Sequence, residues 1–383
     1  MKTIVAKHVV LGAGAVGTSA AFRLARRGEA VVLVERFRVG HDRGSSHGLA
    51  RITRHSYADP VYARVMPKAF DAWRELEADA AEAVYFRTGG ASICPPTSDY
   101  VARVADNLRE LGVAHRRMSG AEWRRASPCF STPDDYDVVF ETDAGLLSAA
   151  RIVALQLELA KRFGADRFQL VEQCEIDRID FDAERPTLVS KDVTIVADRL
   201  IVAAGAWVGK LLPEAASLRP TRQRVFYFRP DNPSPFAVGR FPVFIFIDEN
   251  AGDAFYGMPD FLGSGVKAAR HGGPEVDPDL ESRTIEECER EDARAFLREQ
   301  LSILAAAPIA REEICLYTSA FDEHFRLGCW PGRADVLVAS PCSGHGFKFA
   351  ALNGRILADL ATETPLDVDI SPWNWESFVT KGS

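Results

Sequence analysis

The sequence predicts a mixed α/β fold in which a parallel-sheet domain is interleaved with a second domain built on an antiparallel sheet. Two observations lead to this prediction. Residues 12–17 form a glycine-rich turn between a short apolar run and a helix-like stretch, as in a parallel α/β unit. Residues 222–256 instead alternate in the manner of antiparallel strands, with turns rich in Pro, Asp and Gly between them. A chain of 383 residues also suits two domains better than one.

The apolar run at residues 8–11 is followed by the spacing G-x-G-x-x-G. The first glycine permits a tight turn, the second lets backbone N–H groups approach a pyrophosphate, and the third lets the helix expected at 18–27 pack on the strand. A second apolar run, residues 30–34, ends in Glu35, where an acid can accept hydrogen bonds from a ribose. These features predict a Rossmann-type dinucleotide site and disfavour a purely structural turn. The residues expected to contact the nucleotide are Gly12, Gly14, Ala15, Val16, Gly17, Glu35 and Arg36.

The elements that follow are predicted from periodicity. Apolar residues at helical spacing predict a helix over 61–79, and aromatic and β-branched residues predict a strand over 83–93. Residues 192–204 predict two short strands that return to the nucleotide domain and end at Gly205 and Trp207, where bare backbone suits a flat cofactor. Further helices are expected at 147–163, 283–304 and 347–362, and a buried strand at 336–339.

This order of elements predicts two discontinuous domains. The nucleotide-binding domain is expected to comprise residues 1–85, 143–215 and 320–383, and the substrate domain residues 86–142 and 216–319.

Composition excludes several classes of function. The net charge of −8, without a dense Lys/Arg stretch, argues against nucleic acid and against an anionic membrane surface. The seven cysteines are scattered and never spaced C-x-x-C, which argues against a disulfide framework and a zinc site. The histidines show no ligand spacing, so we expect no metal. No apolar stretch is long enough to span a membrane, and we expect a cytoplasmic protein whose partners are small molecules.

Four further clusters accompany the glycine turn: residues 44–55, residues 256–271, the Cys-Leu-Tyr-Thr run at 315–318, and Ser-Gly-His-Gly-Phe-Lys at 343–348. With these clusters the chain resembles, from its first strand to its last helix, the monomeric sarcosine oxidase and N-methyltryptophan oxidase family, flavoproteins of the D-amino-acid oxidase type. The resemblance implies FAD rather than NAD, bound by a glutathione-reductase-type Rossmann domain.

The resemblance also implies how the flavin is bound. In this family a cysteine at the position of Cys315 forms a thioether to the flavin. The alternatives are that Cys315 is simply a small buried hydrophobic residue or that Cys342 competes for the flavin. Residues 343–348 precede a helix whose N-terminus would point at the flavin pyrimidine ring, where negative charge accumulates on reduction. The other FAD contacts expected are Ser45, His47, Arg51, Gly205, Trp207, Gly344, Gly346 and Lys348.

For the substrate, the resemblance implies that Arg54 and Lys348 clamp a carboxylate. The alternative for Arg54 is a salt bridge within the fold. Arg51 would stack against the flavin ring, and it would share a face with Arg54 if the segment were helical. Lys267 would lie near flavin N5 through a water, where a fixed cation stabilises superoxide. The remaining pocket residues implied are Tyr256, His271, Tyr317 and His345.

The chain departs from the family's motif at residues 46–50. The family commonly has His-His-Gly-Asp-Thr before the first arginine, whereas this chain has Ser-His-Gly-Leu-Ala and so lacks one imidazole, an acid and a hydroxyl. Ile247 also stands where a sarcosine-specific enzyme would have a flexible methionine, which favours a pocket of different shape.

We therefore expect a monomeric, FAD-dependent oxidase of a small N-substituted amino acid such as sarcosine or an N-methyl amino acid. The products would be hydrogen peroxide and an imine that hydrolyses to an amine and an aldehyde. The alternative substrate is a bulkier amine, either a fructosyl amino acid or a cyclic imino acid. The alternatives from other classes are a nicotinamide-dependent dehydrogenase and a flavin-binding module without catalysis. The combination of Arg54, Lys267 and Lys348 disfavours the module, because a mere binder needs no carboxylate clamp.

Overall fold

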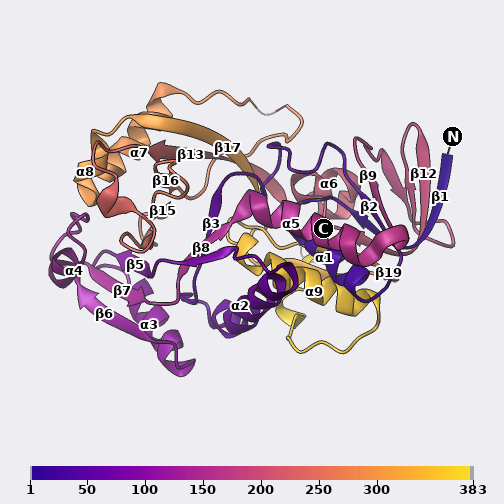
Figure 1. Ribbon diagram of the computed structural model, residues 1–383, viewed down its shortest axis with the longest axis horizontal. Helices are drawn as coiled ribbons and strands as arrows, with labels where there is room; N and C mark the ends of the chain where they lie inside the picture. Colours follow the sequence, from indigo (N-terminus) through magenta and orange to yellow (C-terminus); the bar gives the residue numbers. More distant parts are fainter. Residues whose placement is uncertain (1, 281, 380–383) are drawn as a thin grey trace.

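The computed structural model describes residues 2–280 and 282–379, and two sheets dominate it (Figure 1). Within these residues the first sheet has eight strands. They are β1 (Lys2–Leu11), β2 (Val31–Val34), β9 (Phe168–Val171), β10 (Arg178–Asp180), β11 (Thr187–Val189), β12 (Val193–Val202), β18 (Arg326–Trp330) and β19 (Arg333–Ser340). Strand β1 lies at the centre, parallel to β2 and β12, and β12 is in turn parallel to β19.

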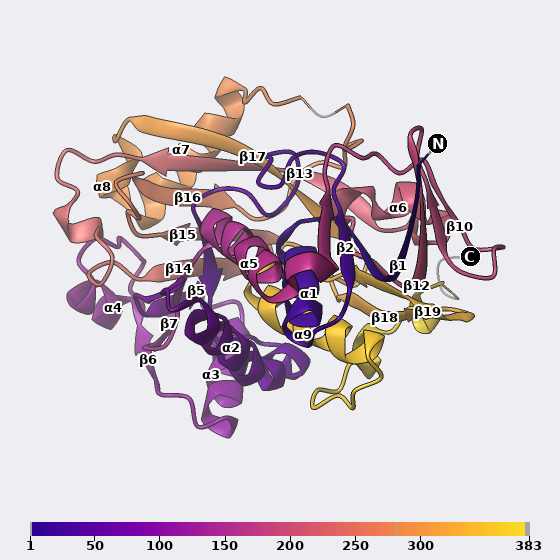
Figure 2. The same cartoon turned by 45° about the vertical axis from the view of Figure 1, so that its right-hand side comes forward.

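Both faces of this sheet are buried, as expected of parallel strands with connecting segments on each side. Val10 packs with helices on one face, and its neighbours Val9 and Leu11 pack in a separate cluster on the other. The helices on the Val10 face are α1 (Ala15–Arg26), α2 (Pro60–Ala80), α5 (Ala149–Gly164) and α9 (Ala350–Ala361). In both views α1 lies between α5 and α9 (Figures 1 and 2).

The second sheet, at the opposite end of the molecule, also has eight strands among the described residues (Figure 2). They are β5 (Gly90–Cys94), β6 (His115–Ser119), β7 (Asp137–Glu141), β13 (Arg219–Phe228), β14 (Val243–Asp248), β15 (Asp253–Met258), β16 (Val266–Arg270) and β17 (Ile309–Ser319). Its neighbouring strands are antiparallel, except that β14 runs parallel to β5.

The two faces of the second sheet differ in what they contact. One face carries phenylalanines such as Phe244 and Phe255, which pack against α7 (Glu287–Gln300) and α8 (Ser302–Ala305). The other face carries a smaller cluster that includes Tyr227 and Cys315. A small third sheet, with strands β3 (Ala50–Thr53), β8 (Gly145–Ser148) and β4 (Tyr85–Arg87), contributes a further core. The remaining helices are α3 (Tyr100–Glu110), α4 (Gly120–Ala126), α6 (Val208–Leu211) and α10 (Glu376–Val379).

Three local predictions are wrong, and a fourth, the helix over 347–362, is confirmed except for its first turn. The two short strands expected over 192–204 are one ten-residue strand, β12, because parallel pairing with β1 extends along its whole length. The single strand expected over 83–93 is divided between β4 and β5, which belong to different sheets. The helix expected over 283–304 begins at Glu287 and is broken into α7 and α8. The last long helix begins at Ala350, after a single 3₁₀ turn.

The segments predicted for each domain can be compared with the sheets. The strands of the first sheet lie within residues 2–34, 168–202 and 326–340, and those of the second within 90–141 and 219–319. The domain boundaries themselves stay a prediction. No helix within the described residues is long and apolar enough to cross a membrane.

Candidate active site

One large cavity, of about 1200 Å³, extends from the glycine turn after β1 to the second sheet. Two residues predicted for the site, Gly17 and Lys267, are not part of its wall. All the others line it: Gly12, Gly14, Ala15, Val16, Glu35, Arg36, Ser45, His47, Arg51, Arg54, Gly205, Trp207, Tyr256, His271, Cys315, Tyr317, Gly344, His345, Gly346 and Lys348. Residues far apart in the sequence therefore meet around one space.

The glycine turn is built for close approach. Gly12 has φ +103°, which favours glycine, and a Cβ on Gly17 would lie 1.8 Å from the Gly12 carbonyl oxygen. Gly17 thus serves helix–strand packing and does not face the cavity. Helix α1 has no side-chain hydrogen bond from its N-cap, Gly14, but its first N–H, that of Ala15, donates to the Ser46 hydroxyl at 3.0 Å, and Ala15 and Val16 line the cavity.

Glu35, at the end of β2, fixes the shape of the nucleotide end. One of its oxygens accepts a hydrogen bond from the Ala13 N–H at 2.7 Å, and the other accepts from the Phe37 N–H at 2.9 Å. Both oxygens keep further lone pairs that can accept from a ribose hydroxyl. Nearby, the Arg36 guanidinium lies 5.5 Å from the Trp207 ring centroid.

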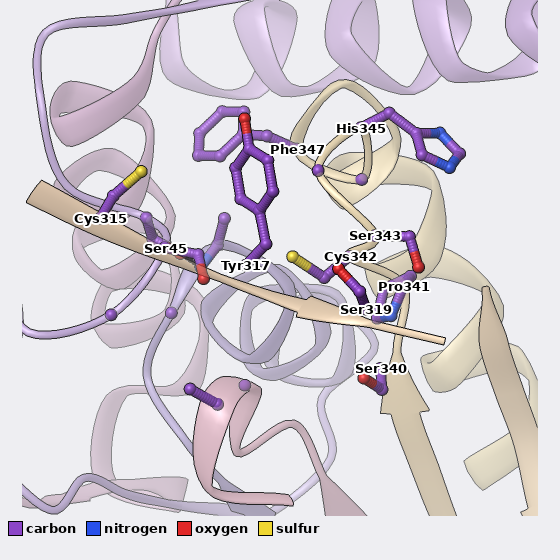
Figure 3. Close-up of a pocket in the computed structure, with 18 of the residues that line it drawn as sticks. Ser45, Cys315, Tyr317, Ser319, Ser340, Pro341, Cys342, Ser343, His345 and Phe347 are labelled. Carbon is purple, nitrogen blue, oxygen red and sulfur yellow. Dashed lines mark hydrogen bonds between the residues drawn. The ribbon is translucent and has the colours of Figure 1, made fainter. Parts of the chain in front are cut away.

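The two candidate attachment cysteines both line the cavity. Cys315 and Tyr317 project from the same side of β17, and Cys342, on the turn that follows β19, points toward Tyr317 (Figure 3). Burial raises the pKa of both thiols. Two buried cations, Arg51 and Lys267, oppose the increase at Cys315, whereas Arg51 is the one cation that opposes it at Cys342. Hydrogen bonds from the Gly344 and Thr318 N–H groups and from Ser45 also oppose the increase at Cys342, so nearby cations favour the Cys315 thiolate and hydrogen bonds favour the Cys342 thiolate.

Arg51 and Arg54 do not share a helix face. Arg51 belongs to β3, so the helical arrangement considered from the sequence is wrong. Its guanidinium donates to three carbonyl oxygens, those of Ala50 at 2.9 Å, Ser45 at 2.9 Å and His47 at 2.7 Å. Arg51 therefore fixes the turn that replaces the family's His-His-Gly-Asp-Thr run.

Arg54 and Lys348 form the cationic end of the cavity. The Arg54 guanidinium lies 4.9 Å from the Tyr57 ring centroid and 3.5 Å from the Tyr100 hydroxyl, and its buried Nε has no protein partner. Arg54 makes no salt bridge within the described residues, so the alternative that it only pairs within the fold is wrong. Burial, with Arg54 adding repulsion, holds the pKa of Lys348 well below its usual range.

A hydrogen-bonded chain fixes Lys348 in place. Its Nζ donates to the His345 carbonyl oxygen at 2.9 Å and to the Tyr57 hydroxyl at 3.0 Å. His345 Nε2 lies 3.1 Å from the Glu323 carbonyl oxygen, which can only accept, so Nε2 carries the proton. Because burial holds the pKa of His345 well below its usual range, Nδ1 is an acceptor for the Tyr57 hydroxyl at 3.0 Å. The chain leaves one ammonium hydrogen of Lys348 free for a substrate anion.

His271 and Tyr317 form the wall near the C-terminal turn. Their ring centroids lie 5.3 Å apart, and burial lowers the pKa of His271 to about 4. A Cβ on Gly344 would lie 2.2 Å from the His271 ring and 2.6 Å from the Tyr317 ring. Glycine at 344 therefore lets the turn, the imidazole and the phenol pack together.

Lys267 lies beside the cavity but is not exposed to it. Its Nζ donates to the Ala50 carbonyl oxygen at 3.3 Å and lies 5.7 Å from the Tyr256 ring centroid. Burial, with Arg51 adding repulsion, lowers the pKa of Lys267 to about 7. Its side chain is thus poised between the charged and neutral forms at physiological pH.

The sequence analysis missed Tyr57 and Tyr100. Tyr57 contacts Lys348, and Tyr100 contacts Arg54, at the cationic end of the cavity. Tyr57 follows Arg54 closely in sequence, and that proximity was a usable signal. Tyr100 comes from α3, and no local pattern placed it near Arg54. Ile247, singled out from the sequence, does line the cavity. No group of three metal-ligating side chains is assembled in the described part of the chain.

The family described as DAO, FAD dependent oxidoreductase, matches residues 7–360. The chain belongs to this family. It is 31% identical over 371 residues to monomeric sarcosine oxidase of Bacillus sp. (strain B-0618), covering 95% of this chain and 94% of that protein. It is 29% identical to N-methyl-L-tryptophan oxidase of Salmonella arizonae, covering 97% and 98%. The chain is therefore an FAD-dependent amine oxidase, which overturns the nicotinamide alternative.

Solved structures show the same fold. NikD, an unusual amino acid oxidase essential for nikkomycin biosynthesis, aligns with a TM-score of 0.84 at 22% identity and 97% coverage of both chains. Fructosamine oxidase from Aspergillus fumigatus aligns with a TM-score of 0.82 at 20% identity, covering 99% of this chain and 91% of that one. The cavity fits the cofactor of this family, because its glycine turn, the N-terminus of α1 and Glu35 suit a dinucleotide.

Proposed function

We propose that this protein oxidises a small amino acid with a secondary amine, such as sarcosine or an N-methyl amino acid. The observation that supports the proposal best is the pair of buried cations, Arg54 and Lys348, at one end of the cavity. Two relatives are named for such substrates, sarcosine and N-methyl-L-tryptophan. The reaction removes two electrons and two protons from the amine, gives them to oxygen as hydrogen peroxide, and leaves an imine that water splits into amine and aldehyde.

The clamp would orient the substrate by its carboxylate. Arg54 offers Nε and the free Lys348 hydrogen adds a second donor, so the carboxylate is held from two sides. Fixing the carboxylate places the C–H bond next to the amine in one position. FAD, when bound, supplies the two-electron acceptor. Arg51, Ser45, His47, Trp207 and the turn at 343–348 would hold it, with Cys315 as the covalent attachment point.

The amine must react as the free base, because its lone pair becomes part of the imine. The Arg54 guanidinium repels a neighbouring ammonium, and His271 is neutral above its pKa of about 4. These neighbours favour the neutral amine. We place Lys267, a buried cation next to Arg51, as the group that favours reduction of oxygen.

The cavity itself favours a second candidate, a bulkier amine. Besides Ile245 and Ile247, its wall includes the polar residues Arg103, Asp248 and Glu249. A fructosyl or cyclic substituent could lie against these residues while the carboxylate stays on Arg54.

The experiment that tests the proposal is anaerobic mixing of the purified protein with candidate amines. Sarcosine, N-methyl amino acids, fructosyl-glycine and cyclic imino acids are added separately, and bleaching of the flavin absorbance is followed. We expect bleaching by at least one secondary amine that carries a carboxylate and none by its amide, which the clamp cannot bind. Equal bleaching by acid and amide would contradict the clamp, and bleaching by the bulkier substrates alone would select the second candidate.

A further inference from the structure

Glu313 is a buried carboxylate that no part of the proposed reaction uses. It lies on β17, two residues before Cys315 and four before Tyr317, so the three side chains share one face of the strand. Cys315 and Tyr317 line the cavity, and the Glu313 side chain is 8% exposed. Glu313 therefore belongs to the same row of β17 side chains as Cys315 and Tyr317, which line the cavity.

The position of Glu313 is fixed by specific contacts. Its Oε2 accepts a hydrogen bond from the Tyr227 hydroxyl at 2.9 Å. A Cβ on Gly48 would lie 2.9 Å from this Oε2 and 3.3 Å from Arg51 Nη1. The absence of a side chain at Gly48 thus leaves the carboxylate and the guanidinium next to each other. Lys267 Nζ completes the group, 6.0 Å from the Tyr227 ring centroid.

The charges around Lys267 make Glu313 distinctive. The charged and titratable groups that face Lys267 are Arg51, Arg311, Glu313, Cys315, Tyr227 and Tyr256. Glu313 is the one carboxylate in this set, and residues 46–50 supply no acid. Two cations buried side by side are costly unless an anion accompanies them. Arg311 also pairs with Glu313, with Nη2 and Oε1 2.5 Å apart, but it is 46% exposed, so solvent screens its charge.

We propose that Glu313 is a positioning residue whose carboxylate favours the charged form of Lys267 and holds Arg51 beside the turn at 46–50. The proposal builds on the proposed function, which gives Lys267 its role with oxygen. Electrostatics agrees with the geometry: burial and Arg51 lower the pKa of Lys267, and Glu313 raises it. Glu313 would thus supply from β17 the negative charge that the motif at 46–50 lacks in this chain.

The test uses the flavin-loaded enzyme and two matched substitutions. Glu313→Gln removes the charge and keeps an oxygen for the Tyr227 hydroxyl. Glu312→Gln makes the same chemical change one residue away, where the side chain pairs with Arg290 instead. Arg311→Gln removes a half-exposed cation that lowers the pKa of Lys267, so its effect has the opposite sign.

The first readout is the pH dependence of reoxidation of the reduced enzyme by oxygen. We expect the apparent pKa of the reoxidation rate to fall by at least about one unit in Glu313→Gln. At pH values above the wild-type pKa, the variant should then be reoxidised about tenfold more slowly than the wild type. The apparent pKa should rise in Arg311→Gln and stay within about 0.3 unit in Glu312→Gln. In a Lys267→Met background, Glu313→Gln should cause no further shift. An unchanged profile in Glu313→Gln, or an equal shift in Glu312→Gln, would overturn the proposal.

The second readout does not depend on activity. In protein grown with ¹³C-lysine, the Cε resonance of Lys267, identified by its loss in Lys267→Met, reports protonation directly. Its midpoint should fall in Glu313→Gln and rise in Arg311→Gln, and a midpoint that is the same in both variants would refute the coupling. A different result would be that Lys267→Met is reoxidised at the normal rate while the Lys267 midpoint still shifts in Glu313→Gln. The proposed role of Lys267 with oxygen would then be wrong, and the charge coupling between Glu313 and Lys267 would stand. The Arg311 variant also keeps the test valid if Glu313→Gln does not fold.

Discussion

Single residues around the cavity differ in how their charge is balanced. Arg51 is surrounded by carbonyl oxygens, and Lys267 has Glu313 nearby. Arg54 and Lys348 hydrogen-bond only to neutral groups within the described residues, and the one carboxylate that raises the pKa of Arg54, Glu141, is engaged by His55 and Ser56. A cation without an anion in a buried site is costly, and the cost is reduced when an anionic ligand binds. The substrate end is therefore prepared for a carboxylate.

This imbalance predicts a pH-dependent affinity for carboxylate ligands. The pKa of Lys348 is well below 10.5 in the free site, and a bound carboxylate raises it, so binding takes up a proton. The dissociation constant of a small carboxylic acid without an amine should thus increase, by up to about tenfold per pH unit, above the lowered pKa of Lys348. His271, with a pKa of about 4, stays neutral there and contributes nothing. Flavin difference spectra measure the binding.

Lys348→Met serves as the control for that prediction. Without the lysine, the affinity should be weaker and nearly constant over the same pH range. A pH dependence that survives in Lys348→Met would show that another group takes up the proton.

At Cys315 the prediction concerns the covalent bond. Arg51 and Lys267 both favour its thiolate, against the effect of burial. Acid precipitation of the wild-type protein should leave the yellow colour in the pellet, and Cys315→Ser should move it to the supernatant. Cys342→Ser should keep the colour in the pellet. If the two variants exchange these outcomes, Cys342 is the attachment point.

At the scale of elements, the chain relies on close contacts between secondary structures. The glycines at 12 and 17 let α1 start directly against β1, and Arg51 lies in a strand where its guanidinium reaches back to the preceding turn. Each element thus positions the cofactor end through backbone groups.

Two alanine substitutions separate packing from cofactor approach. Gly14 and Gly17 both have an ordinary backbone conformation, but an added Cβ would lie 3.0 Å from the Ser46 Oγ at Gly14 and 1.8 Å from the Gly12 oxygen at Gly17. Gly17→Ala should therefore lower the Tm by several degrees or abolish soluble expression, since backbone cannot move away cheaply. Gly14→Ala should fold with a near-normal Tm and retain less flavin.

Circular dichroism measures the Tm of each variant. The ratio of flavin absorbance, at about 450 nm, to protein absorbance, at about 280 nm, measures how much flavin each variant retains. A Tm loss that is equal in both variants would contradict the division of roles between the glycines.

At the scale of the whole molecule, the cavity lies between the two large sheets and takes its wall from both. Gly12 and Glu35 belong to the first sheet's side, and Tyr256 and Cys315 to the second. A ligand that occupies this cavity contacts both halves of the chain. Cofactor binding and global stability are therefore linked.

This linkage predicts a flavin-dependent Tm. Cys315→Ser protein stripped of flavin should melt at a lower temperature than the loaded protein, and added FAD should restore the Tm in proportion to the logarithm of its concentration. At 100 times the dissociation constant the gain is about 2.7 kcal/mol. Thermal unfolding at several FAD concentrations measures it, with ATP as a ligand that fills only the adenosine end. A Tm independent of FAD would show that the halves are held together without the cofactor.

Local sequence patterns were sufficient for the nucleotide end and for the main elements. The turn at 12–17 and Glu35 are adjacent to the strands that carry them, so spacing alone placed their backbone groups. The helix predicted over 61–79 corresponds to α2, and the resemblance pointed to the family that the comparison shows. Local patterns were less reliable where pairing with a distant strand determines the length of an element. Strand β12 is an example, because its hydrogen bonds to β1 extend it.

The sequence by itself determined the dinucleotide turn, the α/β class and the set of charged residues available for chemistry. Only the tertiary structure decided which of these residues meet. It brought Tyr57 and Tyr100 to Arg54, placed Lys267 beside rather than in the cavity wall, and put Glu313 next to Arg51. The physical reason is that a turn is encoded by neighbours in the chain, whereas the charge balance of a buried site depends on strands that pair although roughly a hundred residues separate them in sequence.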